Sequence, residues 1–416
     1  MTSRQGGQRL LTFDFIALCL LVFFTFSNTT VYYSLDVYLE MLHIDPGWRG
    51  FLIGSSSLAT IAAYLVLSPV ITPRRAAPCA SLGAALMIAC GFSYLFASSP
   101  WELLALRLGN GLAFALLLAS ATALFVRIIP PGLSGRAFGL YSIAGLLPFS
   151  VVPAAFDHFT RDPAQTARGY MYMSLFLLPA LVLMLTKGRS MGRRADAPGG
   201  GRTGGAVSFG AMLQNAAKPP VAMILAMTAL YLVMFSTVFY LAKGFFLHRP
   251  VAEVGMFFTL QMLCIMAIRL VSMGLFDRVR KTRLIMLAFG LTGAGCLLTA
   301  TAQGPVQAYG AALVMGAGMG VGSPLLNALM FSISERGFQA VNTNLISMFQ
   351  QMGSFIGPVA GAAAVQLGGE TGFLAAGAAA SFAALALCAV FDLKGMDRTP
   401  HGAAEETLQA ARTDGA

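Results

Sequence analysis

Residues 219–246 read PPVAMILAMTALYLVMFSTVFYLAKGFF, and Lys243 is the only charged residue among them. A helix that crosses a bilayer core needs about 20 consecutive apolar residues, and this stretch exceeds that length. Hydrophobic residues make up 57% of the chain and charged residues 11%, whereas about a quarter of the residues in a soluble domain are charged. The stretch and the composition together predict a protein that lies in a lipid bilayer.

Stretches of this kind follow one another almost from end to end of the chain. Lipid cannot satisfy open backbone N–H and C=O groups, so each stretch is expected to be a helix. The alternating strands of a membrane β-barrel are not seen. The predicted fold class is an all-α integral membrane protein with 12 transmembrane helices in two pseudo-symmetric six-helix bundles. The expected crossings are residues 12–39, 48–71, 78–97, 101–127, 136–157, 168–187, 219–246, 252–275, 282–302, 306–331, 341–366 and 370–392.

Basic residues predict the orientation of these crossings. If the N-terminus is cytoplasmic, the inner loops and tails hold most of the 27 Lys and Arg residues, and the outer loops hold only Arg49, Arg161, Arg168 and Arg249. Cytoplasmic loops are enriched in Lys and Arg, so both termini are expected in the cytoplasm of a bacterial cell, with the chain multi-pass in the inner membrane. This asymmetry accounts for the net charge of +10. No basic face for nucleic acid is predicted.

One long polar stretch divides the chain. Residues 187–218 contain Gly199-Gly200-Gly201, Gly204-Gly205 and several arginines, a composition typical of a flexible linker. Six predicted crossings lie on either side of it. The expected divisions are an N-terminal six-helix bundle over 1–187, a cytoplasmic linker over 188–218, a C-terminal six-helix bundle over 219–393 and a cytoplasmic tail over 394–416.

The two halves repeat one another in short segments. Thr29-Thr30-Val31-Tyr32-Tyr33 in the first crossing recurs as Ser236-Thr237-Val238-Phe239-Tyr240 in the seventh. Gly109-Asn110-Gly111 in the fourth crossing recurs at the same spacing as Gly316-Ala317-Gly318 in the tenth. Two parallel six-helix halves, related by an axis along the membrane normal, are a known transporter design.

Four segments resemble a known family. GLFDRVRK at 274–281 and GSFIGPVAG at 353–361 are similar to the cytoplasmic loop motif and the eleventh-helix motif of the major facilitator superfamily. Arg107 with Gly111 is similar to the family's intramembrane arginine motif, and residues 131–139 to the short loop before the fifth crossing. The chain resembles the superfamily over essentially its whole length. The resemblance implies a monomeric secondary transporter that exposes a small-molecule site to each side of the membrane in turn.

The resemblance also implies roles for single residues. The residues expected at an inner gate are Asp277, Arg278 and Arg280. Those expected to bend the eleventh crossing are Gly353, Gly357, Pro358 and Gly361. The fifth crossing departs from the family's exporter motif, because residues 148–153 read PFSVVP. This departure keeps uptake open as an alternative to export.

Charged side chains within the crossings are candidates for function. A charge at the bilayer centre costs about 2.5–3.5 kcal/mol on insertion scales, which makes each a functional candidate by default. Asp36 and Lys243 occupy matching places in the first and seventh crossings, and Arg107 lies at a compatible depth in the fourth. We expect these three to form one set under the outer mouth. Three roles stay open: proton coupling, a static ion pair at an outer gate, or contact with interfacial water by snorkelling. Arg269 is expected to support the inner loops.

Polar and aromatic residues are candidates for the wall of a substrate cavity. Consecutive helix positions point about 100° apart, so Gln350 and Gln351 are not both expected to face it squarely. Each candidate has an alternative role, which is helix packing for the polar residues and an interfacial aromatic belt for the tyrosines. The candidates are Asn28, Thr29, Tyr33, Asn110, Tyr240, Gln261, Gln350 and Gln351.

No motif predicts an enzyme. The six cysteines are scattered singly and the four histidines are isolated, so neither a metal site nor a disulfide framework is expected, and no cofactor is expected. The predicted function is a secondary active transporter of a small organic solute across the cytoplasmic membrane, with proton-coupled efflux by antiport favoured. The alternatives are an uptake symporter or facilitator for a metabolite and, in another class, a non-transporting membrane sensor or scaffold.

Overall fold

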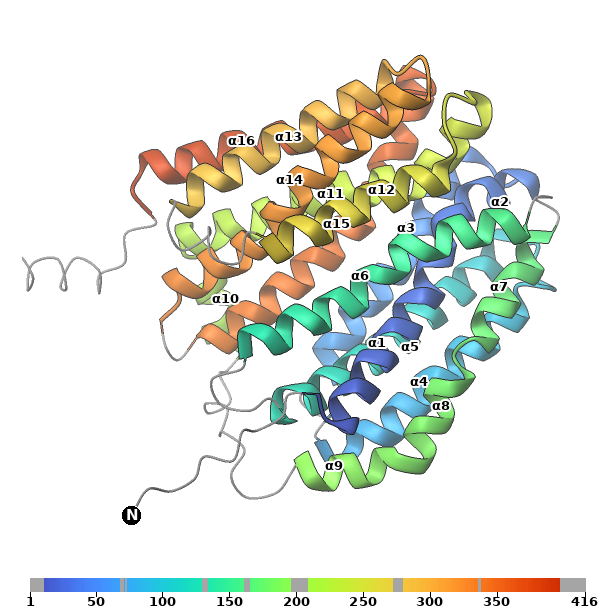
Figure 1. Ribbon diagram of the computed structural model, residues 1–416, viewed down its shortest axis with the longest axis vertical. Helices are drawn as coiled ribbons and strands as arrows, with labels where there is room; N and C mark the ends of the chain where they lie inside the picture. The colour runs from blue at the N-terminus through green and yellow to red at the C-terminus, as the bar shows by residue number, and fades with distance from the viewer. Residues whose placement is uncertain are drawn as a thin grey trace, which may run out of the picture.

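Long helices running roughly along one direction make up the protein (Figure 1). The computed structural model describes residues 11–67, 71, 73–128, 134–160, 165–195, 209–271, 280–335 and 338–396. Within these ranges every regular element is a helix and no strand is assigned. The predicted all-α membrane fold is confirmed.

The described residues of the N-terminal half form six crossings, of which the first and the sixth are built from several helical pieces. The first consists of α1, η1 and α2, and the sixth of α7, α8 and η3. Pro179 lies in the first turn of α8, where the N–H that proline lacks would have no partner within the helix. A new helical piece of the sixth crossing therefore begins there. The elements are α1 (Phe13–Thr30), η1 (Val31–Ser34), α2 (Leu35–Met41), α3 (Pro46–Leu67), α4 (Pro73–Ser93), α5 (Pro100–Ile128), α6 (Ser134–Phe159), α7 (Thr166–Leu175), α8 (Leu178–Leu183), η3 (Met184–Gly188) and α9 (Arg189–Ala195).

The described residues of the C-terminal half also form six long helices. Eleven spans in the described part of the whole chain are long and apolar enough to cross a membrane. The twelfth long helix, α15, has 30 residues but includes Gln350 and Gln351, which face the interior rather than lipid, as described below. The elements are α10 (Phe209–Ala216), α11 (Pro219–His248), α12 (Val254–Val271), α13 (Lys281–Ala300), α14 (Pro305–Ile333), α15 (Gln339–Gly368) and α16 (Gly372–Leu393).

Local sequence explains where the long helices begin. Proline stands at the first position of α3, α5, α11 and α14, where its fixed φ suits the helix and its missing N–H costs nothing. At the start of α5, Glu102 accepts hydrogen bonds from the backbone N–H groups of Ser98 and Ser99, at 2.9 and 3.0 Å. The Ser99 hydroxyl in turn accepts from the N–H of Glu102. These bonds satisfy donors that have no partner within the helix.

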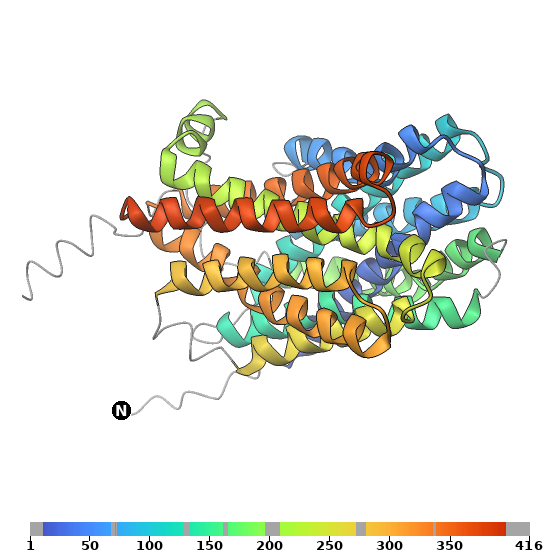
Figure 2. The same cartoon turned by 90° about the horizontal axis from the view of Figure 1, so that it is seen from above.

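The two halves lie side by side and share a common direction. Helix α1 begins, and α16 ends, at the same end of the bundle, where α9 and α10 also lie (Figures 1 and 2). We call this the inner end. The outer end is the opposite one, where α2 is followed by α3; both names follow the topology predicted from the sequence. Helices α9 and α10 occupy the two ends of the predicted linker 188–218, and residues 196–208 lie outside the described residues.

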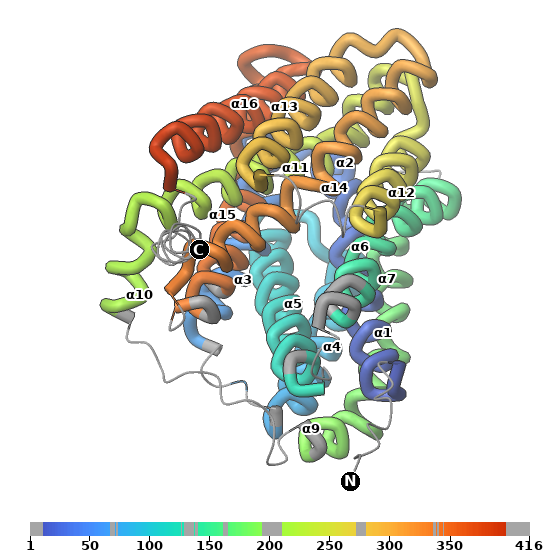
Figure 3. Tube along the Cα trace, turned by 60° about the vertical axis from the view of Figure 1, so that its left-hand side comes forward, coloured from blue at the N-terminus to red at the C-terminus, as the bar shows by residue number. Residues whose placement is uncertain are grey.

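Contacts between the halves gather toward the outer end. Helix α3 packs on α15, α6 packs on α12, and α11 packs on η1 and α2 (Figure 3). One buried apolar cluster fills the C-terminal half and continues into the outer part of the N-terminal half, through Tyr33, Leu52 and Phe156. The inner part of the N-terminal half has a separate cluster, which includes Leu21 and Leu124. The core is therefore continuous between the halves at the outer end and divided at the inner end.

Candidate functional site

A cavity of about 470 Å³ lies between the two halves. From the N-terminal half, α1, η1, α3, α5 and α6 contribute to its wall, and from the C-terminal half, α11, α12, α14 and α15. This volume lies within the usual range for small-molecule sites. The packing between the halves described above lies on the outer side of this cavity.

Of the described residues that line the cavity, two are charged; both are arginines and none is a carboxylate. Arg107 comes from α5 and Arg269 from the last turn of α12. They reach the same cavity from opposite halves of the molecule. Its wall therefore carries positive charge from both halves.

Arg107 is held in place by the neighbouring helix α3. Its Nη2 donates to the carbonyl oxygen of Ile53 at 2.8 Å and to the hydroxyl of Ser56 at 2.6 Å, and its Nε donates to the carbonyl oxygen of Leu52 at 3.3 Å. The guanidinium also lies over the ring of Tyr32, 4.8 Å from its centroid. All these partners are neutral, so they fix the side chain without cancelling its charge.

Tyrosines and Asn110 form a polar cluster beside Arg107. Asn110 Nδ2 donates to the hydroxyls of Tyr32 and Tyr94 at 2.9 and 3.3 Å. The Tyr32 ring packs against Tyr170, with centroids 4.9 Å apart. Asn110 Oδ1 is buried and has no hydrogen-bond partner among the described residues. Asn110 thus offers an unused acceptor at the cavity wall.

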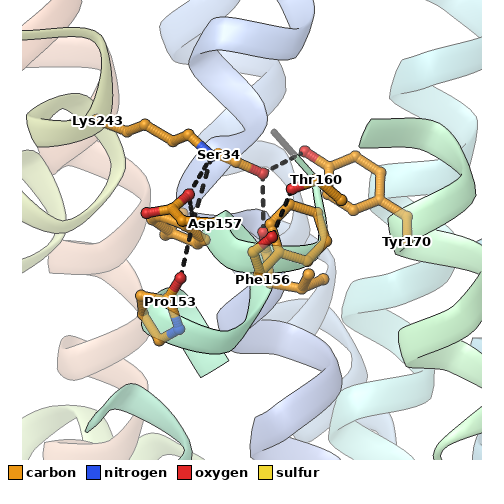
Figure 4. A network of polar contacts seen from close by, with 9 residues as sticks. Ser34, Pro153, Phe156, Asp157, Thr160, Tyr170 and Lys243 are labelled. Carbon is orange, nitrogen blue, oxygen red and sulfur yellow. Dashed lines mark hydrogen bonds and ion pairs between the residues drawn. The ribbon is translucent and has the colours of Figure 1, made fainter. Parts of the chain in front are cut away.

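An ion pair joins the two halves toward the outer end. Lys243 Nζ of α11 lies 2.7 Å from Asp157 Oδ1 of α6 and 3.2 Å from the Tyr33 hydroxyl of η1. The Tyr33 hydroxyl also donates to Asp157. The ammonium packs over the rings of Tyr33 and Phe156 as well, at 4.8 and 5.5 Å from their centroids. Figure 4 shows the Lys243 side chain reaching across to Asp157.

The predicted set of Asp36, Arg107 and Lys243 is not formed in this conformation. Asp36 lies against α11, where a Cβ added at Gly244 would stand 3.4 Å from its carboxylate. It makes no ion pair with a described residue, because Lys243 turns to Asp157 and Arg107 is held by α3. Neighbouring positions on α11 thus meet two different carboxylates of the other half.

The predicted substrate residues divide into two groups. Thr29, Asn110, Tyr240, Gln350 and Gln351 line the cavity. Gln350 and Gln351 do so together, although their helical spacing favoured only one of them; the wide cavity reaches both positions.

The other predicted substrate residues point elsewhere. Asn28 donates to the Ser174 hydroxyl at 3.0 Å, and Gln261 donates to Met319 Sδ at 3.5 Å. Tyr33 belongs to the ion-pair cluster described above. In these three, packing between helices is the role that this conformation displays.

The predicted inner gate is described only in part. Arg280 Nη2 lies 3.0 Å from Asp392 Oδ1 at the end of α16, while Asp277 and Arg278 lie outside the described residues. Arg269 was expected to support the inner loops, yet it lines the cavity. Among the side chains that the structure describes, no group of three or more His, Cys, Asp or Glu residues is placed to hold a metal ion.

The glycines of the predicted helix-bending motif let α15 pack tightly on α11. A Cβ at Gly353 would come within 2.3 Å of the Ala229 carbonyl oxygen, and one at Gly357 within 2.0 Å of the Ser236 hydroxyl. The opposite side of α15 meets α3 of the other half, where a Cβ at Gly50 would lie 2.6 Å from the Pro358 carbonyl oxygen. Small residues of this kind allow helix backbones to approach closely.

Sequence reasoning missed Asp157 and the pair Gly50 and Gly54. Asp157 stood at the end of a predicted crossing, where a charge is ordinarily read as a helix boundary; α6 continues to Phe159. A signal was available for the glycines, because Gly50 and Gly54 are four residues apart on one helix, the spacing of close helix contacts. Gly54 meets Phe355 of α15 just as Gly50 meets Pro358.

Comparisons with known proteins agree with this geometry. Solved structures with the same fold include the nucleoside transporter NupG (TM-score 0.71, 13% identity, covering 92% of this chain and 99% of that one). They also include a POT family transporter in complex with 5-aminolevulinic acid (TM-score 0.72, 13% identity, covering 91% and 96%). A sequence comparison with curated proteins found no match. The sequence profile of the Major Facilitator Superfamily matches this chain twice, over residues 16–248 and 244–414. The chain belongs to the Major Facilitator Superfamily.

Proposed function

We propose that this protein is a secondary active transporter that moves a small organic solute by alternating access. The observation that carries the proposal is the cavity between two pseudo-symmetric halves, with the contacts between the halves gathered at its outer side. Such a cavity becomes open to the other side when the halves rock about it. A sensor or scaffold would not need a charged cavity of this size at the division between the halves.

The ion pair of Lys243 and Asp157 acts as an outer latch in this proposal. Opening the outer end separates α11 from η1 and α6, and so breaks the 2.7 Å contact. A proton on Asp157 removes the carboxylate charge that holds Lys243. Proton binding at Asp157 would therefore weaken this latch, and Asp157 is the first candidate for the carboxylate that carries the proton in efflux by antiport. Asp36, beside Gly244, stays a second candidate for the proton-binding carboxylate.

Direction and placement in the cell belong to the same proposal. Efflux is favoured over uptake by a symporter or facilitator. In this proposal the protein is a monomer in the bacterial inner membrane, with both termini in the cytoplasm. The basic residues of the inner loops support that orientation.

A reversible lock at the outer end tests alternating access. In a background without the six native cysteines, Ser150→Cys and Thr259→Cys place thiols on α6 and α12, where the Thr259 hydroxyl lies 2.7 Å from the Ser150 carbonyl oxygen. In proteoliposomes, oxidation should stop flux of a solute chosen by a thermal-shift screen, and reduction should restore it. Each single cysteine variant, treated with the same oxidant, is the control. Undiminished flux through the fully cross-linked protein would refute alternating access.

A further inference from the structure

We infer that the cavity selects amphipathic organic anions, that is, compounds with a carboxylate on an apolar or aromatic body. The inference rests on the proposed transport function and names its substrate class. It starts from the charges of the wall: among the described residues that line the cavity, Arg107 and Arg269 are charged and none is a carboxylate. The nearby Lys243 is already neutralised by Asp157. An anionic solute would supply the missing counter-charge.

Arg269 provides the clearest anion-binding group. Its Nε is buried and has no hydrogen-bond partner among the described residues. The Tyr231 side chain interacts with it electrostatically, but the Tyr231 hydroxyl is neutral and donates to the Met319 carbonyl oxygen at 3.2 Å. Arg269 lies in the last turn of α12, where the helix dipole favours a positive charge. The dipole supplies no hydrogen-bond acceptor for the N–H donors of the Arg269 side chain. A carboxylate can satisfy them, since it matches the fork of a guanidinium.

Arg107 offers a second positive charge at the same cavity. Its bonds run to backbone carbonyls of α3 and to Ser56, so it is fixed before any solute binds. The Tyr240 side chain of α11 interacts electrostatically with Arg107 and also lines the cavity. A fixed cation loses little conformational entropy on binding, which favours selection of the ligand's charge.

The rest of the wall suits an apolar body. Phe149 of α6 packs on Phe239 and Phe235 of α11, with centroids 5.2 and 5.8 Å apart. In the N-terminal half, Phe26 and Phe114 pack edge to face, with centroids 5.4 Å apart. All five rings line the cavity. An amphipathic anion would place its body against these rings and its carboxylate at an arginine.

Matched ligands test the inference on full-length protein in lipid nanodiscs. Naphthalene-2-carboxylate, naphthalene-2-carboxamide and 2-(aminomethyl)naphthalene share one body and differ in charge. The same carboxylate, amide and ammonium groups on an indole body and on a decyl body make the test independent of the shape of one ligand. Calorimetry should find at least one carboxylate that binds about tenfold tighter than its own amide, with the ammonium compound weakest.

Arginine variants assign this preference to the cavity. Arg269→Gln should bring the preferred carboxylate to within about threefold of its amide, while Arg269→Lys should retain most of the preference. The matched control is Arg249→Gln, because Arg249 lies outside the cavity in a half-exposed pair with Glu370. Arg249→Gln should leave the preference unchanged. Thermal melting of each variant confirms that it is folded.

Two results would overturn the inference: no carboxylate in wild-type protein exceeds its amide tenfold, or folded Arg269→Gln keeps the wild-type preference. Either result leaves the transport proposal standing if neutral or cationic solutes still cross in a manner that the outer disulfide lock stops. Flux that is indifferent to the lock would instead remove the transport mechanism, whatever the charge of the bound ligand.

Discussion

Lys243 of α11 and Asp157 of α6 meet at 2.7 Å and join the two halves of the protein toward its outer end. Their side chains are 11% and 28% exposed, so the pair is neither a surface contact nor fully buried. Ion pairs at these two extremes of exposure differ sharply in their contribution to stability. Exposed pairs contribute about 0–1 kcal/mol, and breaking a fully buried pair costs about 3–5 kcal/mol.

We predict that Asp157 and Lys243 are energetically coupled. Asp157→Asn should destabilise the protein by roughly 1–3 kcal/mol, between the two extremes, because it leaves the ammonium without its counter-ion. Adding Lys243→Gln should recover part of that loss, as measured by thermal unfolding in nanodiscs. Asp36→Asn combined with Lys243→Gln is the comparison, and its effects should add. A non-additive Asp36 cycle together with an additive Asp157 cycle would assign the latch to Asp36 instead.

We predict that a bulky residue at Gly54 holds the outer end open. A Cβ there would stand 2.6 Å from the Phe355 carbonyl oxygen of α15, so Gly54→Leu forces α3 away from the other half. Gly244→Cys, a buried position beside Asp36, reports opening through maleimide labelling from the outer side. Labelling should become several-fold faster. Gly310→Leu, which meets nothing within 4 Å of its Cβ, should leave the rate unchanged.

A substitution at a glutamine that lines the cavity should weaken binding more than one at a glutamine that packs between helices. Gln350→Leu removes a polar group from the cavity wall and should weaken the preferred solute by roughly three- to tenfold, the equivalent of one neutral hydrogen bond. Gln261→Leu should leave affinity within about twofold of wild type, since Gln261 is not among the described lining residues and its amide bonds to the side chain of Met319. Equal losses in both variants would contradict this division.

We predict that Asp277→Asn slows transport without abolishing substrate binding. The resemblance of residues 274–281 to the family's loop motif predicts a role for Asp277 at an inner gate rather than in substrate binding. Flux in proteoliposomes and calorimetric affinity, measured on the same preparation, separate the two effects. Glu335→Gln is the control, because Glu335 forms an exposed pair with Lys218 and should alter neither quantity. Loss of binding in folded Asp277→Asn would argue against the gate.

The predicted topology has its own test. A reporter fused after residue 416 should score as cytoplasmic in bacteria, and a Gly–Ser insertion between residues 200 and 201 should leave transport intact. The same insertion after Gly192, within α9, should reduce the amount of folded protein, because α9 packs on α4 and α5. A reporter that scores as periplasmic would reverse the orientation.

Apolar length and spacing made the helices predictable, whereas pairings between side chains were not. Lys243 was identified from its cost in the bilayer, but its partner depends on how α11 meets α6, which no spacing within one helix reveals. The repeat favoured Asp36, since Asp36 and Lys243 occupy matching positions. Symmetry-related positions need not touch across the axis, and here the ammonium reaches Asp157 instead. Arg269 was placed by its nearness along the chain to the predicted inner loop and by the family resemblance, and neither says which face of α12 it occupies.

The positive wall of the cavity has an electrical consequence. Alternating access exposes Arg107 and Arg269 first to one side of the membrane and then to the other, so part of the transmembrane voltage acts on them. A full crossing of one elementary charge corresponds to about 2.3 kcal/mol per 100 mV. In a cell with a negative interior, the voltage favours the empty protein with its cavity turned inward. A bound anion cancels part of that charge and so releases the loaded protein from this bias.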